Sequence, residues 1–122
     1  METEVLALTQ RLLDAISRRD WAAYTELCDP GLTCFEPEAC GQLVTGLPFH
    51  QFYFADGASE ARVQSTICSP VVHALGPDAA VVAYTRVIQT RDGERAFEET
   101  RVWKRVDGCW WHVHFHRSPV TT

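Results

Sequence analysis

The sequence has no surplus of positive charge. Eleven basic residues stand against sixteen acidic ones among 122 residues, which gives a formal net charge of −5. A chain without a basic surplus has little to offset the repulsion of a phosphate backbone. We therefore expect no nucleic acid among its partners.

Long hydrophobic runs are missing as well. No apolar stretch approaches the roughly eighteen residues that a membrane span needs. The first four residues, Met-Glu-Thr-Glu, include two acidic side chains and no basic one, whereas a signal peptide begins with basic residues. We expect no contact with a membrane and a cytoplasmic location.

Paired cysteine motifs are also absent. The five cysteines are an odd number without a CxxC pair, which favours reduced thiols: Cys28, Cys34, Cys40, Cys68 and Cys109. The spacing of Cys28, Cys34 and Cys40 matches no structural zinc site. The sequence therefore predicts small buried core residues here, with no metal and no cofactor.

The composition is that of an ordinary globular chain. Apolar residues make up 46% and charged residues 22%, a mixture too apolar for global disorder. A chain of this length can bury one sizeable core. We expect a single domain over residues 1–122.

The first half of the sequence predicts helices. Apolar residues at positions 5, 8, 12, 13 and 16 form one stripe of an amphipathic helix, with Thr3 placed to cap it. Asp20 can cap a second short helix that carries Trp21, Tyr24 and Leu27. A short strand is expected at residues 32–35, and Pro48 opens a third helix that continues to Phe54.

The second half predicts strands. Residues 63–74, 79–90, 96–106 and 109–117 are rich in β-branched and aromatic side chains. The turn pairs Gly76-Pro77, Asp92-Gly93 and Asp107-Gly108 separate them. Helices followed by a curled antiparallel meander indicate an α+β domain.

Strand alternation brings arginines onto the apolar face of three neighbouring strands. Side chains two apart share a face, which groups Val82, Tyr84, Arg86 and Ile88, then Glu99, Arg101 and Trp103, then Trp111, Val113, Phe115 and Arg117. A buried unpaired guanidinium costs several kcal/mol. The site must therefore hold acidic side chains, a bound anion or water.

The opposite face of the last strand carries three alternating histidines, His112, His114 and His116. A His-x-His pair can hold zinc when further ligands are present. No strong fourth ligand is identifiable, so we expect these rings on the outer face of the sheet, at a contact between subunits.

Several separate blocks, in order, resemble one known family. They are residues 23–33 (AYTELCDPGLT), 35–39 (FEPEA), 52–54 (FYF), 98–103 (EETRVW) and 114–118 (HFHRS), with Gly46, Phe49 and His50. Together they resemble the association (hub) domain of calcium/calmodulin-dependent protein kinase II over residues 6–118. The resemblance implies a cone-shaped α+β fold of the nuclear-transport-factor-2-like superfamily, with a long N-terminal helix packed in a curved antiparallel sheet.

The resemblance also implies a function. Hub domains of this kind assemble as two stacked rings, usually of twelve or fourteen subunits, so the expected partner is the chain itself, in rings of twelve, fourteen or more subunits. A kinase of the same class is a further expected partner. The chain has neither a Gly-rich phosphate loop nor an HRD motif, and it is not expected to be a kinase. Family members are reported to bind small carboxylates, and the matching positions here are His50, Arg86, Arg101 and Arg117.

An enzyme of the same fold is the alternative. Ketosteroid isomerases and dehydratases act in the cone cavity, and Glu36, Glu99, His50 and Tyr84 are candidates for a base. Neighbouring arginines would keep a carboxylate ionised, which makes it a poor base near neutral pH. Two interpretations of the arginines stay open: a pocket that binds a carboxylate or an acidic peptide segment, and a structural arginine–glutamate network without a ligand.

Overall fold

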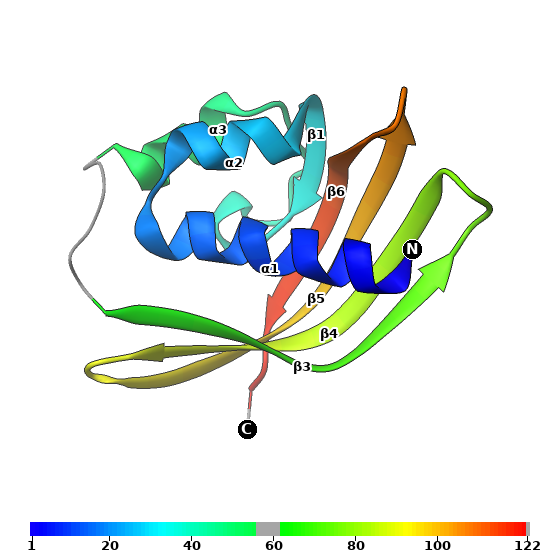
Figure 1. Ribbon diagram of the computed structural model, residues 1–122. Coiled ribbons are helices and arrows are strands. Elements are labelled where there is room, and N and C mark those ends of the chain that lie inside the picture. Colours follow the sequence, from blue (N-terminus) through cyan, green and yellow to red (C-terminus); the bar gives the residue numbers. More distant parts are fainter. Residues whose placement is uncertain (56–61, 122) are drawn as a thin grey trace.

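The computed structural model describes residues 1–55 and 62–121. In chain order the elements are α1 (Glu2–Arg18), α2 (Trp21–Leu27), β1 (Cys28–Phe35), the 3-10 helix η1 (Pro37–Ala39), β2 (Val44–Thr45), α3 (Pro48–Gln51), the 3-10 helix η2 (Phe52–Phe54), β3 (Val63–Ala74), β4 (Ala79–Thr90), β5 (Gly93–Val106) and β6 (Cys109–Pro119). Figure 1 shows α1 lying across one face of a curved sheet, with α2 and α3 near the β1 end. The expected α+β fold, with a long N-terminal helix packed in a curved sheet, is confirmed.

The helices begin and end close to the predicted positions, with one correction. α1 starts at Glu2 with Met1 as its N-cap, so Thr3 lies inside the first turn and is not the cap. Acidic side chains at Glu2 and Glu4 suit the positive end of the helix dipole and favour this earlier start. The Asp20 cap is confirmed, because its carboxylate accepts the backbone N–H of Ala23 at 3.1 Å. No helix in the described ranges has the length and apolar character needed to cross a membrane.

The long strands form the meander that the turns predict. β3 and β4 have the expected bounds, whereas β5 starts three residues earlier and β6 ends two residues later than expected. At the β5–β6 turn Asp107 and Gly108 have φ values of 50° and 79°. Positive φ at both central residues gives the type I′ twist that suits a tight hairpin.

The sheet is not antiparallel throughout, which corrects the expectation. Its order is β2-β1-β6-β5-β4-β3, and β1 runs parallel to β6, with Thr33 opposite His114 and Phe35 opposite His116. The remaining neighbours pair antiparallel. No turn links β1 to β6, so nothing local in the sequence reports the direction of this pairing.

An irregularity in β6 changes which side chains face the core. Val102 of β5 lies opposite His114, but the next residue, Trp103, lies opposite His112. Val113 is therefore an extra residue, a β-bulge that resets the two-residue alternation.

The bulge overturns two expectations about β6. Trp110 and His112 are buried ahead of it, while Trp111 and Val113 are only half-buried and do not share the core face of Phe115. The expected outer-face position of His112 is wrong, because its side chain is 0% exposed. The ring packs between the rings of Trp103 and Phe115, at centroid distances of 5.2 and 5.7 Å.

Two tryptophans attach α1 to the sheet. The Trp103 indole N–H donates to the Thr9 hydroxyl at 3.1 Å, and that hydroxyl donates to the Val5 carbonyl at 2.8 Å. The Trp110 indole N–H donates to Glu4 at 2.7 Å. Burying a side chain as large as Trp103 contributes about 4–6 kcal/mol of transfer free energy. These contacts hold α1 over the sheet and leave a space near its C-terminal end.

Candidate functional site

A cavity of about 190 Å³ lies near the C-terminal end of α1, between the helices and the inner face of the sheet. Four polar side chains that line it were named from the sequence: His50, Arg86, Arg101 and Arg117. The rest of its wall is apolar or aromatic, formed by Ile16, Tyr24, Tyr53, Phe54, Ile88 and Phe115. The arginines come from β4, β5 and β6, so strand alternation brings them together.

Behind the cavity, one carboxylate serves two guanidinium groups. Glu99 accepts from Arg86 Nη1 at 3.1 Å, from Arg101 Nη2 at 3.0 Å and from the Tyr84 hydroxyl at 2.6 Å. Glu99 and Arg101 are 2% and 1% exposed. Arg86 Nε also donates to the Ser65 hydroxyl at 3.0 Å. Two positive charges and one negative charge leave this buried group with an excess of positive charge.

The pKa of Glu99 reflects the positive charges of Arg101 and Arg86. Burial opposes ionisation of its carboxyl, but the charges of Arg101 and Arg86 outweigh burial and hold the pKa at about 2. Burial also raises the pKa of Tyr84 well above its ordinary value, so its hydroxyl remains a donor. Glu99 is therefore an ionised partner of the arginines and a poor proton acceptor near neutral pH.

Arg101 also determines the protonation of the buried His112. Its Nη1 lies 3.4 Å from His112 Nε2, and because a guanidinium only donates, Nε2 accepts. The proton of the neutral ring then resides on Nδ1, which lies 3.5 Å from Cys28 Sγ. Burial, together with the charge of Arg101, keeps the pKa of His112 well below its ordinary value. The face of the Phe115 ring covers the guanidinium of Arg101 at 4.5 Å.

Arg117 has its own acidic partners. Its Nη2 donates to Glu38 at 2.5 and 2.6 Å and lies 3.6 Å from Glu36 Oε2. Glu38 follows Glu36 through the turn of η1, and the sequence analysis missed it because that turn lies far from Arg117 in the chain. The Glu36 side chain is 5% exposed, and burial raises its pKa although Arg117 opposes this effect.

His50 lines the cavity from α3. Its ring is 4% exposed, and burial, followed by the charges of Arg101 and Arg117, lowers its pKa to about 4. On the side of β1, Nε2 lies 3.6 Å from Cys34 Sγ and Nδ1 lies 3.7 Å from Glu36 Oε1. A neutral imidazole with one donor and one acceptor nitrogen therefore stands beside the arginines.

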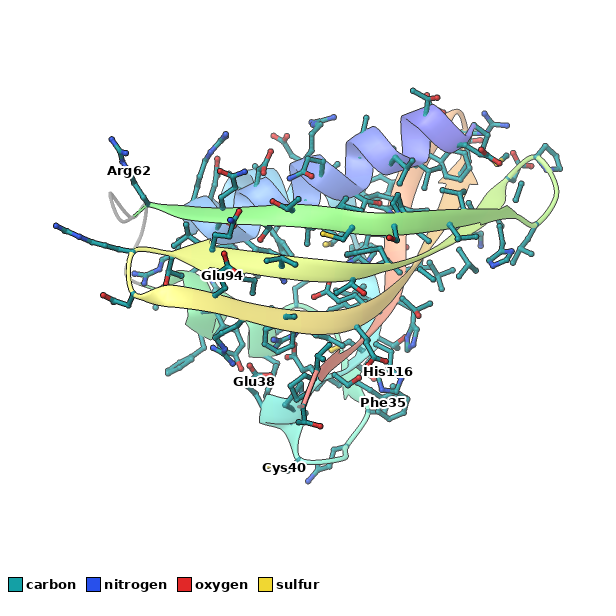
Figure 2. All side chains as sticks on the ribbon, turned by 90° about the horizontal axis from the view of Figure 1, so that it is seen from below. Phe35, Glu38, Cys40, Arg62, Glu94 and His116 are labelled. Atoms are coloured by element: carbon teal, nitrogen blue, oxygen red, sulfur yellow. The ribbon has the colours of Figure 1, made fainter. Side chains whose placement is uncertain are left out.

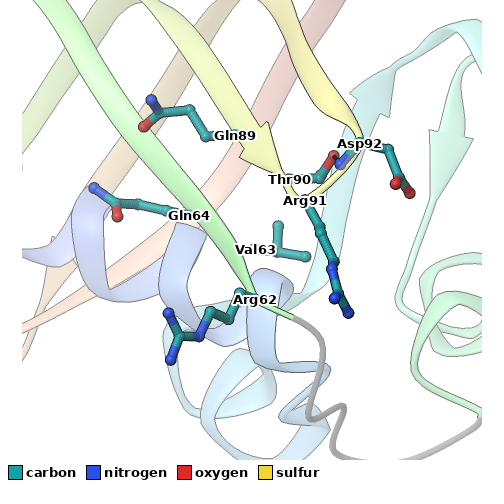
Figure 3. Close-up of a pocket in the computed structure, with 7 residues that line it drawn as sticks. All are labelled: Arg62, Val63, Gln64, Gln89, Thr90, Arg91 and Asp92. Atoms are coloured by element: carbon teal, nitrogen blue, oxygen red, sulfur yellow. Dashed lines mark hydrogen bonds between the residues drawn. The ribbon is translucent and has the colours of Figure 1, made fainter.

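A second, larger hollow has a different character. It opens at the start of β3 and the end of β4, and Figure 3 shows its lining: Arg62, Val63, Gln64, Gln89, Thr90, Arg91 and Asp92. Of these only Val63 is half-buried, and the other side chains are exposed. It is an open surface depression without buried polar groups in its lining, so the smaller cavity is the candidate functional site.

The two remaining histidines of the strand lie on its outer face. His114 Nδ1 lies 2.7 Å from the Thr33 hydroxyl, and the rings of His114 and His116 lie 6.3 and 5.5 Å from the Phe35 ring. Phe35 is 37% exposed, and Figure 2 shows it beside His116. We call Phe35, His114 and His116 the outer patch.

The chain is similar to a known family over nearly its whole length. Residues 1–121 match the family described as calcium/calmodulin dependent protein kinase II association domain. The delta subunit of calcium/calmodulin-dependent protein kinase type II from Oryctolagus cuniculus is 49% identical over 126 residues, which cover 98% of this chain. The chain spans 24% of the length of that relative.

Solved structures agree with the sequence comparison. The hub homology domain from Chlamydamonas reinhardtii is 45% identical and superposes with a TM-score of 0.92, with 98% of each chain covered. The association domain of the C. elegans kinase is 46% identical, with a TM-score of 0.89 over 96% of this chain and 94% of that chain.

A more distant structure has the same fold. An NTF2-like protein from Cytophaga hutchinsonii is 20% identical, with a TM-score of 0.81 over 98% of each chain, and this likeness bears on the fold alone. The family that matches is the association domain of the kinase and not its catalytic domain, so the chain is not the catalytic part of such a kinase. The chain belongs to the family of calcium/calmodulin-dependent protein kinase II association domains.

Proposed function

We propose that this chain assembles with copies of itself into a closed, ring-shaped homo-oligomer, built as two stacked rings with about twelve or fourteen subunits in all. Membership of the association-domain family is the observation that supports this proposal. A kinase of the same class is a proposed partner, since its own association domain could join the same ring. The proposed location is the cytoplasm, because a reducing compartment would keep the five free cysteines as thiols.

The outer patch is the part of the surface that we assign to subunit contacts. Phe35 exposes a large apolar ring at the β1–β6 seam, flanked by the imidazoles of His114 and His116. Exposed aromatic rings such as that of Phe35 are enriched in such contacts. His112 takes no part in this surface, because it lies in the core.

A charge placed on the outer patch tests this assignment. Phe35→Asp should reduce the sedimentation coefficient of the assembly, because a carboxylate would be buried without a partner at the contact. Val106→Asp is the matched control, since Val106 is 43% exposed at the β5–β6 turn. An unchanged assembly in Phe35→Asp, or equal dissociation in both variants, would contradict the assignment.

We further propose that the cavity binds the carboxylate of a small molecule or of an acidic peptide segment. The supporting observation is the excess of positive charge: Arg86 and Arg101 share the single carboxylate of Glu99. Arg86 Nη2 has no hydrogen-bond partner within residues 1–55 and 62–121, so a ligand could use this donor. A volume of about 190 Å³ accommodates roughly half a dozen non-hydrogen atoms.

Arg86 is a better position than Arg101 for a substitution that tests carboxylate binding. Removing Arg101 would disturb the core, because Arg101 also contacts His112 and Phe115. Arg86→Gln removes the excess charge and leaves Arg101 and Glu99 as a balanced pair. The variant should therefore fold and lose affinity for the ligand.

Isothermal calorimetry with butyrate, the neutral amide butyramide and a short glutamate-containing peptide provides the measurement. We expect the wild type to bind a carboxylate but not butyramide, and Arg86→Gln to bind about 10- to 100-fold more weakly, the loss of one charge-assisted hydrogen bond. Arg105→Gln, which removes an arginine paired with Asp78 outside the cavity, should bind like the wild type. Binding of neither carboxylate, or equal binding by wild type and Arg86→Gln, would leave only the structural network.

A further inference from the structure

A cluster of three buried side chains lies next to the cavity and has the composition of a metal site. Cys34 and Glu36 are two residues apart, so they share the inner face of the chain as it leaves β1, and His50 of α3 covers that face. A sulfur, a ring nitrogen and a carboxylate oxygen from these residues lie within 4.8 Å of one another. All three residues are buried, with Cys34 at 0% exposure.

One atom of this cluster lacks a partner. Glu36 Oε1 is buried without a hydrogen bond to any part of the chain that the structure describes. Leaving a buried carboxylate oxygen without a partner is costly, and a bound cation would remove that cost. Two neighbouring groups do not supply the missing bond. His50 Nδ1 faces this oxygen at 3.7 Å, beyond hydrogen-bond distance, and Arg117 Nη2 hydrogen-bonds Glu38 and faces the other oxygen of Glu36 at 3.6 Å.

We propose that Cys34, Glu36 and His50 form a zinc-binding site. Zinc binds thiolate sulfur at about 2.3 Å and imidazole nitrogen at about 2.0–2.1 Å, so tetrahedral geometry places the two ligand atoms about 3.6 Å apart. Cys34 Sγ and His50 Nε2 are separated by 3.6 Å. Glu36 Oε1 lies 3.7 Å from the other ring nitrogen, Nδ1, so zinc binding requires the His50 ring and the Glu36 carboxylate to turn toward one centre.

The charges and the donor atoms of the three ligands favour zinc over other cations. A thiolate and a carboxylate together cancel the two charges of Zn²⁺, so Arg101 and Arg117 face a neutral centre. The mixed sulfur, nitrogen and oxygen set suits zinc better than calcium or magnesium, which prefer oxygen ligands alone. Three protein ligands leave one tetrahedral position for water or an anion.

The sequence alone predicts no metal site, because its patterns offer two other sets of ligands, neither of them complete. One contained only cysteines from one stretch of chain, and the other contained the histidines of β6. The proposed set takes Cys34 from the first and adds His50 and Glu36, which were named for the arginine pocket. Neighbouring cysteine and histidine pairs do not make an equivalent site: Cys28 and His112 lie 3.5 Å apart, but no acidic group completes a cluster there among the described residues.

Metal titration of the chelator-treated full chain tests the site, in a buffer without carboxylates so that the result does not depend on the proposed ligand of the cavity. We expect one tightly bound Zn²⁺ per chain, and with Co²⁺ as a probe a thiolate-to-cobalt charge-transfer band. Cys34→Ser should abolish the band, and Glu36→Gln should weaken zinc binding by about 10-fold or more. Cys40→Ser and His116→Gln remove exposed groups of the same chemistry and should change neither result.

X-ray absorption at the zinc edge of the wild-type protein gives a test that requires no variant. We expect one sulfur at about 2.3 Å and otherwise nitrogen or oxygen neighbours. Substoichiometric zinc, a shell without sulfur, or a cobalt band that persists in Cys34→Ser would overturn the proposal. So would loss of binding in Cys40→Ser or His116→Gln, because the zinc would then lie on the surface.

Discussion

Removing the charge of Glu99 should destabilise the subunit strongly. In Glu99→Gln the guanidiniums of Arg86 and Arg101 would lose the buried carboxylate that both of them contact in the described part of the chain. Removing one partner of a buried ion pair costs about 3–5 kcal/mol. The pKa leads to a similar figure: a decrease from the ordinary 4.5 to about 2 corresponds to about 3 kcal/mol.

The pH dependence follows from the sign of that change. Because the folded state holds the pKa of Glu99 below its unfolded value, its stabilisation is complete above about pH 5 and is lost as the pH falls from about 4.5 toward 2. The wild type should therefore lose about 3 kcal/mol of unfolding free energy across that range. Glu99→Gln should start about 3 kcal/mol lower at pH 7 and show less dependence on acid.

Urea unfolding at pH 7 and at several acidic pH values, at one fixed protein concentration, provides the assay. Glu98→Gln is the matched control, because Glu98 is the adjacent residue of β5 and is exposed. It should stay within about 0.5 kcal/mol of the wild type. A Glu99→Gln variant within 1 kcal/mol of the wild type, with the same acid sensitivity, would refute the interpretation of Glu99 as the counter-ion of both arginines.

Three other outcomes follow from the structure. The assembly should dissociate when the pH falls below the ordinary pKa of histidine, because burial lowers the pKa of His114 and its protonation adds a charge at the outer patch; sedimentation velocity should show this response reduced in His114→Gln. Asp20→Ala should lower the unfolding free energy by about 1 kcal/mol through loss of the α2 cap, measured by urea unfolding. Trp103→Ala should lower the unfolding free energy by about 3–5 kcal/mol, and Trp111→Ala by much less, because Trp103 is fully buried and Trp111 is half-buried. Equal losses in the same assay would contradict the side-chain alternation derived from the bulge.

The parts of the fold that local chemistry determines were predictable from the sequence. β3 and β4 have the predicted bounds because Gly76-Pro77 and Asp92-Gly93 mark their ends. The parallel pairing of β1 with β6 was not predictable in the same way. Thr33 and His114 lie far apart in the chain, and no turn residue reports how they meet.

The site was predictable where alternation holds and not where it breaks. The two-residue period brings Arg86, Arg101 and Arg117 to one cavity, and this follows from the strands alone. The bulge at Val113 moves His112 into the core, and neither composition nor period marks that residue. The contact of Cys34 with His50 depends on how α3 folds over β1, which requires the tertiary structure.

The mass of the purified chain in native mass spectrometry tests the central claim, assembly into a closed ring, most directly. Twelve subunits of 13.8 kDa would weigh about 166 kDa, and fourteen about 193 kDa. The account predicts one or two discrete masses of this kind at micromolar concentration. A mass below about 60 kDa, or a continuous ladder of sizes without a closed species, would contradict it.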